Sequence, residues 1–360
     1  MRYCKLCLYP DSKPDLQIFS DGICSACKNF TNRAEVDWDE RKKELVAILE
    51  KHRSKDSSRY DCIVPSSGGK DSTFQALKMW EFGMNPLIVT VTTDHLTDLG
   101  RRNIENLKNQ GFDTIEVTPN PVLRRKINKL ALETLGDISW PEHLLIFTVP
   151  VRIAVQMNVP LIVWGECSQN EYGGPATATQ SSILNRRWLE EFGGLLGMRV
   201  SDLPDLLRCY PKELIQYQYP SDEDLQRVGV TGIFLGYFVP WSGAGNAEYS
   251  KKHGFETYDK CVEGSAVDYE NLDNGQCGLH DYFKWLKYGF GRASDLVSMA
   301  IRRGTMTREQ GLRLVEERDG AYPESYLGVP LGRILEEIGM TRKEFDACCD
   351  RFRNRKIHAH

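Results

Sequence analysis

The segment Asp-Cys-Ile-Val-Pro-Ser-Ser-Gly-Gly-Lys-Asp-Ser, residues 61–72, joins a short apolar strand to the start of a helix through two glycines. Glycines let the backbone turn tightly and bring N–H groups close to an anion, and the start of a helix adds unpaired N–H groups and the positive end of its dipole. Ser67 and Ser72 supply hydroxyl donors, and Lys70 supplies a positive charge. Asp71 is placed to orient the loop or to help hold magnesium. The segment therefore predicts a phosphate-binding turn.

Beyond this turn, apolar strands alternate with amphipathic helices. Further strands are predicted over 87–92, 114–117, 161–164 and 232–238, with helices near 71–82, 98–110, 122–135 and 142–157. This alternation implies right-handed crossovers and a parallel sheet covered on both faces. The predicted fold class is therefore α/β, with a doubly wound parallel sheet inside residues 35–277. The stretch 173–179 is predicted to be a loop over the carboxyl ends of the strands, where such sheets bind ligands.

Four cysteines near the start of the chain form two closely spaced pairs. They are Cys4 with Cys7, and Cys24 with Cys27. Each Cys-x2-Cys turn offers two sulfurs to one tetrahedral ion, so the spacing predicts a zinc module over residues 1–34, which is too short to hold a core without the ion. Iron–sulfur ligation uses similar spacings and remains open.

The last part of the chain, residues 278–360, reads as a helical subdomain. Helices are predicted over 279–288, 292–303, 307–318, 331–338 and 341–351. Thr307-x2-Gln310 and Thr341-x2-Glu344 have the pattern of capping boxes, in which the first side chain and the fourth each bond the other's backbone N–H.

Composition and charge exclude several classes of protein. The chain has 360 residues, of which 41% are hydrophobic, and Lys+Arg 46 against Asp+Glu 50 give a net charge of −4. The net charge therefore disfavours a nucleic-acid partner, because proteins that bind nucleic acids carry a basic surface. The most apolar run, 144–151, is too short to cross a bilayer, and no apolar signal region opens the sequence, so we expect no membrane and a cytoplasmic location.

The motif SGGKDS after an apolar strand resembles the PP-loop of the ATP pyrophosphatase superfamily. A narrower resemblance covers most of the chain. Tyr3-Cys-Lys-Leu-Cys7, the second cysteine pair and SGGKDS occur in the order seen in N-acetyl sugar amidotransferases, the WbpG/PseA-like family. Lys287-Tyr-Gly-Phe-Gly-Arg-Ala-Ser-Asp295 and Ala300-Ile-Arg-Arg-Gly304 point to this family within the superfamily.

The resemblance implies a sheet of the adenine-nucleotide α-hydrolase type and roles for individual residues. ATP would be cleaved between its α- and β-phosphates, and the loop would bind the β,γ-pyrophosphate with Mg²⁺ through Ser67, Gly68, Gly69, Lys70, Asp71 and Ser72. Asp94, just past the second strand, either meets the adenosine or the metal, or caps a turn. Glu166, at the end of its strand, either orients substrate or ammonia, or is a solvated strand-end carboxylate. Lys70, Asp71 and Glu166 are the expected catalytic residues.

The implied reaction converts an acetamido group of a nucleotide-activated sugar to an acetamidino group during synthesis of lipopolysaccharide O-antigen or a flagellar glycan. Ammonia would come from a separate glutaminase, part of a HisH/HisF-like pair, because Cys4 belongs to the predicted metal site. The alternative is a PP-loop tRNA thiolase, which would insert sulfur. The net charge of −4 disfavours it, and so does the absence of a cysteine pair near the loop, where Cys62 stands alone.

Overall fold

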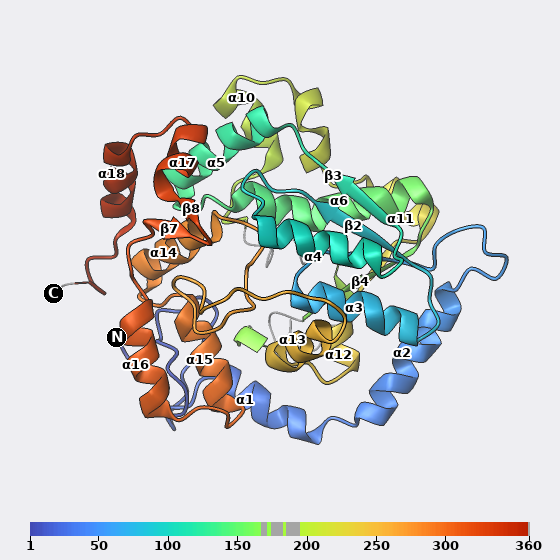
Figure 1. Cartoon of the computed structure of the whole chain (residues 1–360), viewed down its shortest axis with the longest axis horizontal. Helices are drawn as coiled ribbons and strands as arrows, with labels where there is room; N and C mark the ends of the chain where they lie inside the picture. The colour runs from blue at the N-terminus through green and yellow to red at the C-terminus, as the bar shows by residue number, and fades with distance from the viewer. Residues whose placement is uncertain (167–170, 174–182, 185–194, 359–360) are drawn as a thin grey trace.

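The computed structural model describes residues 1–166, 171–173, 183–184 and 195–358 (Figure 1). Most of the predicted loop 173–179 lies outside these residues. The helices are α1 (Ser25–Asn32), α2 (Trp38–His52), α3 (Lys70–Glu81), α4 (Asp98–Asn109), α5 (Pro121–Leu135), α6 (Trp140–Met157), α10 (Leu203–Leu207), α11 (Asp222–Val228), α12 (Leu235–Phe238), α13 (Gly243–Lys251), α14 (Cys277–Tyr288), α15 (Arg292–Arg302), α16 (Arg308–Arg318), α17 (Leu331–Glu337) and α18 (Arg342–Phe352), with short 3-10 turns at Arg33–Glu35, Val200–Asp202 and Pro211–Tyr217. The strands are β1 (Cys62–Pro65), β2 (Pro86–Val91), β3 (Thr114–Val117), β4 (Leu161–Trp164), β5 (Ile183–Leu184), β6 (Thr231–Phe234), β7 (Ser325–Tyr326) and β8 (Val329–Pro330).

The main sheet confirms the predicted α/β class. Its strand order is β3-β2-β1-β4-β6-β5. The first five strands in that order are parallel, and the short β5 runs antiparallel to β6 at the edge. The chain therefore winds outward from the middle of the sheet in two opposite directions. From β1 the chain winds outward through β2 and β3, whereas β4 leads to β6 on the other side.

Helices cover both faces of the sheet. Successive strand residues point to opposite sides, and apolar residues on both sides need a covering layer. Ile63 of β1 packs into the cluster formed with α5 and α6, where Trp140 is fully buried. Its neighbours Cys62 and Val64 pack into the cluster on the other face, formed with α2, α3 and α4. Because they are buried on both faces, β1, β2 and β4 are nearly continuous apolar runs, which is the pattern that predicted them from the sequence.

One predicted element is wrong in part. The apolar run 232–238 was expected to be a single strand, but β6 ends at Phe234 and residues 235–238 form the helical turn α12. At that point the Gly236 N–H donates to the carbonyl of Gly165, 3.0 Å away, so the chain bends over the end of β4. A short apolar run is compatible with either a strand or a helix, so the run alone did not show that the strand ends at Phe234.

The C-terminal region is helical, as predicted. Helices α14, α17 and α18 share a core with Leu132 and Ile138 of the α/β part, and the two-stranded β7–β8 ribbon lies between α16 and α17 in the chain. Both capping boxes are formed, at Thr307 and at Thr341. The N-terminal segment lies beside α15 and α16 (Figure 1), where Tyr9 Oη donates to Asp295 Oδ1 at 2.9 Å. None of the described helices is long and apolar enough to span a membrane.

Candidate functional site

A cavity of about 520 Å³ lies at the carboxyl ends of the central strands. Its walls include Pro65 at the end of β1, Val91 at the end of β2, Trp164 at the end of β4 and Phe234 at the end of β6. The strand order reverses between β1 and β4, and open α/β sheets bind ligands in the crevice outside this reversal. The segment 66–72 leaves β1 at this point, and residues 165–166 leave β4.

The turn after β1 is held in place by contacts within the chain. Gly68 has a φ of +78°, and a Cβ there would lie 2.7 Å from the backbone nitrogen of Ile104, so the loop backbone packs directly on α4. Ser66 Oγ accepts from the Gly68 N–H at 3.0 Å and donates to Ser72 Oγ at 2.9 Å. Ser72 Oγ in turn donates to the carbonyl of Gly69 at 3.1 Å. The sequence prediction included Ser72 and missed Ser66, although it stands next to the glycine turn.

Lys70 is the first residue of α3 and is only 5% exposed. Its ammonium lies 2.5 Å from Asp71 Oδ2 and 2.6 Å from Glu270 Oε1. Burial alone would lower the pKa of Lys70, but the carboxylates of Asp71 and Glu270 outweigh it and raise this pKa, so the side chain keeps its charge. The structure thus provides a buried, permanent positive charge at the start of the helix.

Glu166 lies on the wall of the same cavity as Lys70 and Asp71, so the three predicted catalytic residues meet there, together with Ser67, Gly68, Gly69 and Ser72 of the turn. Burial, and then the negative charge of Asp71, raise the pKa of Glu166 to about 7. The Asp71 carboxylate is oriented by Asn246, whose side-chain amide donates to Oδ1 at 2.8 Å. At neutral pH, Glu166 can therefore either hold a proton or give it up when a cation arrives.

Asp94 lies apart from these residues. Arg124 holds its carboxylate through two hydrogen bonds, one from Nε at 3.0 Å and one from Nη2 at 2.5 Å. The Asp94 side chain is 3% exposed and does not line the cavity, where its neighbour Thr93 does. The Asp94–Arg124 ion pair ties the end of β2 to α5, and the contact of Asp94 with adenosine or metal stays a prediction.

The C-terminal region contributes residues that the sequence analysis did not assign to the site. Glu270 accepts from Lys70 and also pairs with Arg292. Burial would raise the pKa of Glu270, but Lys70 and Arg292 lower it to about 2. One face of α14 also lines the cavity, through Cys277, His280, Asp281 and Lys284. The sequence signal that could have found these four residues was their helical spacing, which places them in one stripe on a helix whose other face is apolar.

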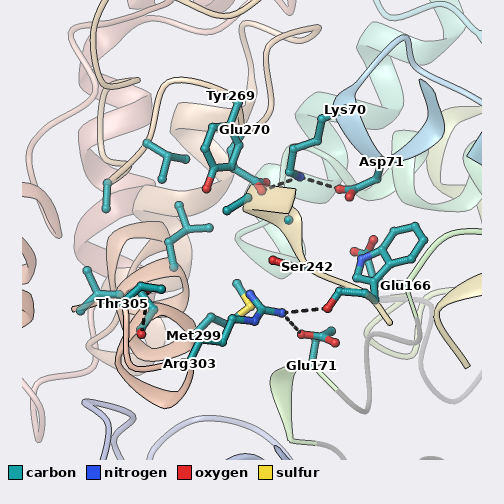
Figure 2. A pocket seen from close by; sticks show the side chains of 18 of the residues that line it. Lys70, Asp71, Glu166, Glu171, Ser242, Tyr269, Glu270, Met299, Arg303 and Thr305 are labelled. Atoms are coloured by element: carbon teal, nitrogen blue, oxygen red, sulfur yellow. Dashed lines mark hydrogen bonds and ion pairs between the residues drawn. The ribbon is translucent and has the colours of Figure 1, made fainter. Parts of the chain in front are cut away.

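A smaller cavity of about 160 Å³ adjoins the first and shares Lys70, Asp71, Glu166, Glu270 and Arg292 with it. Figure 2 shows it between the Lys70–Glu270 pair and the side chain of Arg303, which reaches from beyond α15 to Glu171 at 2.9 Å. The row formed by Lys70, Glu270 and Arg292 therefore borders both cavities.

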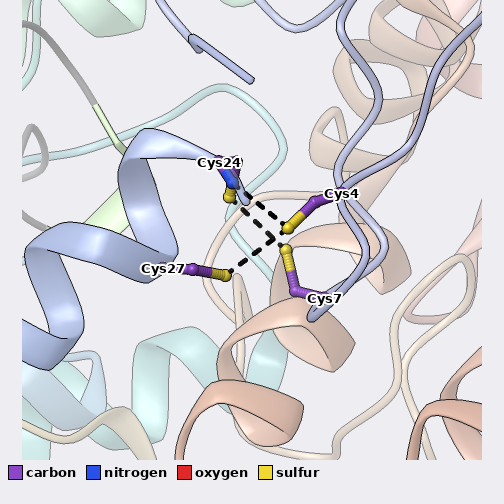
Figure 3. A group of neighbouring side chains, drawn as sticks. All are labelled: Cys4, Cys7, Cys24 and Cys27. Atoms are coloured by element: carbon purple, nitrogen blue, oxygen red, sulfur yellow. Dashed lines mark hydrogen bonds between the residues drawn. The ribbon is translucent and has the colours of Figure 1, made fainter. Parts of the chain in front are cut away.

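The four predicted metal ligands come together. Cys4, Cys7, Cys24 and Cys27 are buried, and their sulfurs all lie within 4.8 Å of one another (Figure 3). The Cys4–Cys27 and Cys7–Cys24 sulfur separations are 3.8 and 3.7 Å. A tetrahedral zinc ion about 2.3 Å from each sulfur places the sulfurs about 3.8 Å apart. The four thiols, none of them in a disulfide, therefore fit such an ion.

Comparison with known proteins finds a family match for the C-terminal part of the chain. Residues 252–360 match the family described as LPS biosynthesis protein WbpG-like, C-terminal domain, which confirms the resemblance to the WbpG-like family. Among solved structures, the NMN synthetase from Francisella tularensis has 13% identity and a TM-score of 0.31, with 61% of this chain and 96% of that chain covered. A TM-score this low supports no conclusion about this chain. No curated protein matches the sequence.

Proposed function

We propose that this chain is an ATP-dependent sugar amidotransferase that converts an acetamido group of a nucleotide-activated sugar to an acetamidino group. One observation carries the proposal. The SGGKDS turn at the strand-order reversal shares its cavity with residues of the matched WbpG-like domain, namely Glu270, Arg292 and one face of α14. The description of that family refers to lipopolysaccharide biosynthesis, which agrees with a sugar substrate.

The proposed chemistry has two steps. An amide oxygen is a poor leaving group, so the substrate's amide oxygen first attacks the α-phosphorus of ATP and pyrophosphate departs. The product is an imidate whose leaving group is AMP. Ammonia then attacks the imidate carbon, AMP leaves with the oxygen, and an amidine remains. The protein's part is to position the groups and to stabilise the charge that develops on the pyrophosphate, through the N–H groups at the start of α3 and through Lys70.

The charges in the cavity agree with a need for Mg²⁺. The described lining contains the carboxylates of Asp71, Glu142, Glu166, Glu270, Asp273 and Asp281. Its lysines and arginine, Lys70, Lys284 and Arg292, are each already paired with a carboxylate. A triphosphate therefore adds negative charge to a site without a spare cation among the described residues, and hard divalent ions with oxygen ligands offset such charge. Asp71 and Glu166 are the proposed ligands, and the ion would neutralise the departing pyrophosphate.

The proposed source of ammonia is a separate glutaminase of the HisH/HisF-like kind. Cys277 lines the cavity on the same helix as His280. Burial, and then the charge of Asp273, raise the pKa of Cys277 well above its ordinary value. A nucleophilic cysteine needs the opposite shift. The same argument disfavours a tRNA thiolase, in which a cavity cysteine would have to carry sulfur as a thiolate.

The test is the identity of the adenine nucleotide formed from Mg-ATP and ammonium with a panel of UDP- and CMP-linked acetamido sugars. We expect AMP and pyrophosphate with one sugar and with no other. ADP would contradict the assignment of the loop, and AMP release that depends on tRNA would favour the thiolase. Lys70→Ala should abolish turnover. Lys78→Ala is the matched control, because Lys78 is on the same helix but pairs with Glu81 outside the cavity.

A further inference from the structure

Two histidines and a buried aspartate form a cluster on the wall of the main cavity. His280 Nδ1 lies 2.8 Å from Asp137 Oδ1, and His143 Nδ1 lies 3.6 Å from Asp137 Oδ2. The two imidazoles meet edge to face with ring centroids 5.0 Å apart. They come from α14 and α6, elements far apart in the sequence, so spacing in the chain gave no sign of the cluster.

The geometry leaves one nitrogen of His280 available to a ligand. Asp137 occupies Nδ1, whereas Nε2 bonds no residue that the structure describes, and the ring lines the cavity that contains the phosphate-binding turn. Its side chain is 31% exposed, against 6% for Asp137. A buried carboxylate that fixes the tautomer and orientation of a cavity-facing imidazole is an arrangement that suits proton transfer.

We propose that His280, oriented by Asp137, accepts the proton that the nitrogen nucleophile loses as the amidine forms. The inference rests on the proposed function and adds a residue to its second step. His280 would be a catalytic residue in that step, and Asp137 a positioning residue.

The step balances as follows. Ammonia attacks the imidate carbon with its lone pair and becomes a –NH₃⁺ group on the tetrahedral carbon. One N–H bond of this group breaks, and its proton goes to Nε2 of His280. The C–N bond is formed from the nitrogen lone pair, and the C–O bond to AMP breaks with its electron pair going to the AMP oxygen. The imidazolium then returns its proton to water.

The groups around His280 make it a stronger base than an ordinary imidazole. They are Asp137 from the turn before α6, His143 from α6, and Asp281 and Lys284 from α14 itself. Burial would lower the pKa of His280, but the charge and hydrogen bond of Asp137 outweigh it and raise this pKa. Burial lowers the pKa of His143 to about 4, so the second ring stays neutral and adds no repulsion.

The test separates the two steps of the reaction. Sugar-dependent exchange between pyrophosphate and ATP, measured without ammonia, reports adenylation, and amidine formation with ammonium reports the second step. The variant is His280→Asn, whose amide can still donate to Asp137. His52→Gln is the matched control, because His52 bonds the carbonyl of Ile48 on its own helix, away from the cavity.

We expect exchange to persist in His280→Asn while amidine formation falls by roughly 10²- to 10⁴-fold, the usual contribution of a general base. The acid limb of the wild-type pH profile should disappear in the variant, and added imidazole should restore part of the rate. Unchanged amidine formation overturns the proposal, and so does equal loss of both steps, since that indicates a structural role. If wild-type protein shows no sugar-dependent exchange, it is the proposed function that fails.

Discussion

Gly68 and Gly69 are neighbours that are glycine for different reasons. A Cβ on Gly68 would collide with the backbone of Ile104, and its φ of +78° is one that other residues rarely adopt. Gly69 has a φ of −69°, and a Cβ there would meet only Ser67 Oγ, at 3.4 Å. We therefore expect Gly68→Ala to lower the free energy of unfolding by about 2 kcal/mol or more. Gly69→Ala should fold normally but bind ATP more weakly.

Urea unfolding of the two variants, followed by ATP titration of those that fold, measures both effects. Equal stability of the two alanine variants would contradict the direct packing of the loop on α4.

Glu270 gives the chain a predictable response to acid. Lys70 and Arg292 lower its pKa to about 2 against burial, from an ordinary value near 4.5. A lowered carboxyl pKa stabilises the folded state above the ordinary pKa, and this contribution is lost as the pH falls from 4.5 toward 2. The shift corresponds to roughly 3 kcal/mol.

Glu270→Gln lacks this contribution. The stability difference between wild type and Glu270→Gln should therefore be largest above about pH 5 and shrink steadily toward about pH 3. Urea unfolding of both proteins across that range measures it. A difference that is independent of pH would mean that Glu270 is not charged through its two ion pairs.

At the scale of elements, local sequence patterns predicted a helix or strand correctly wherever the burial of its residues follows a regular pattern. The α3 helix was predicted within a residue of its observed bounds because an amphipathic helix has periodic apolar positions, and β1 was predicted from its continuous apolar run. The end of β6 was not predictable in this way, since the change to α12 depends on the contact between Gly236 and Gly165 from another strand.

The same distinction applies to the site. The turn at 66–72 and Glu166 follow strands, so their common position was predictable from the chain. Glu270 and His280 reach the cavity only through the packing of the C-terminal region on the sheet, and Asp94 is paired with Arg124 of α5. Contacts between distant segments decide these three cases, and a single sequence carries no direct record of them.

The two capping boxes should differ in their effect because their helices differ in burial. Helix α18 buries Phe345, Cys348 and Cys349 in the shared C-terminal core, whereas Gly311 is the buried residue of α16. Thr341→Ala should lower the global free energy of unfolding by about 1 kcal/mol. Thr307→Ala should mainly increase local opening of α16. Urea unfolding combined with hydrogen exchange distinguishes the two variants. An equal loss in the global free energy of unfolding would contradict the argument from the different burial of the two helices.

At the scale of the whole molecule, two parts of the chain line the site and a third supports it. The sheet supplies the turn and Glu166, and the matched C-terminal domain supplies Glu270 and His280. The N-terminal cysteine segment does not line the cavity but supports its wall. Tyr9 donates to Asp295, whose carboxylate lies 2.8 Å from the Lys284 ammonium on that wall.

We therefore expect loss of a bound metal to affect the activity of the cavity. The apolar neighbours of the cysteine cluster are few, namely Tyr9, Leu16, Ile18, Ile23 and Ala26, so a bound ion would be its main source of stability. Treatment with a chelator under reducing conditions should lower the Tm and also reduce sugar-dependent ATP–pyrophosphate exchange, because Tyr9 and α15 lose their fixed partners.

Cys27→Ser should reproduce both effects and lower the bound metal, while Cys209→Ser, at a half-buried cysteine outside the cluster, should not. Metal analysis and the visible absorption spectrum identify the ion in the same preparation, since zinc thiolates are colourless and iron–sulfur clusters are not. Full exchange activity in a metal-free, folded chain would show that the segment is independent of the cavity. Activity that returns with zinc would show that the connection through Tyr9 and Asp295 depends on the occupied cluster.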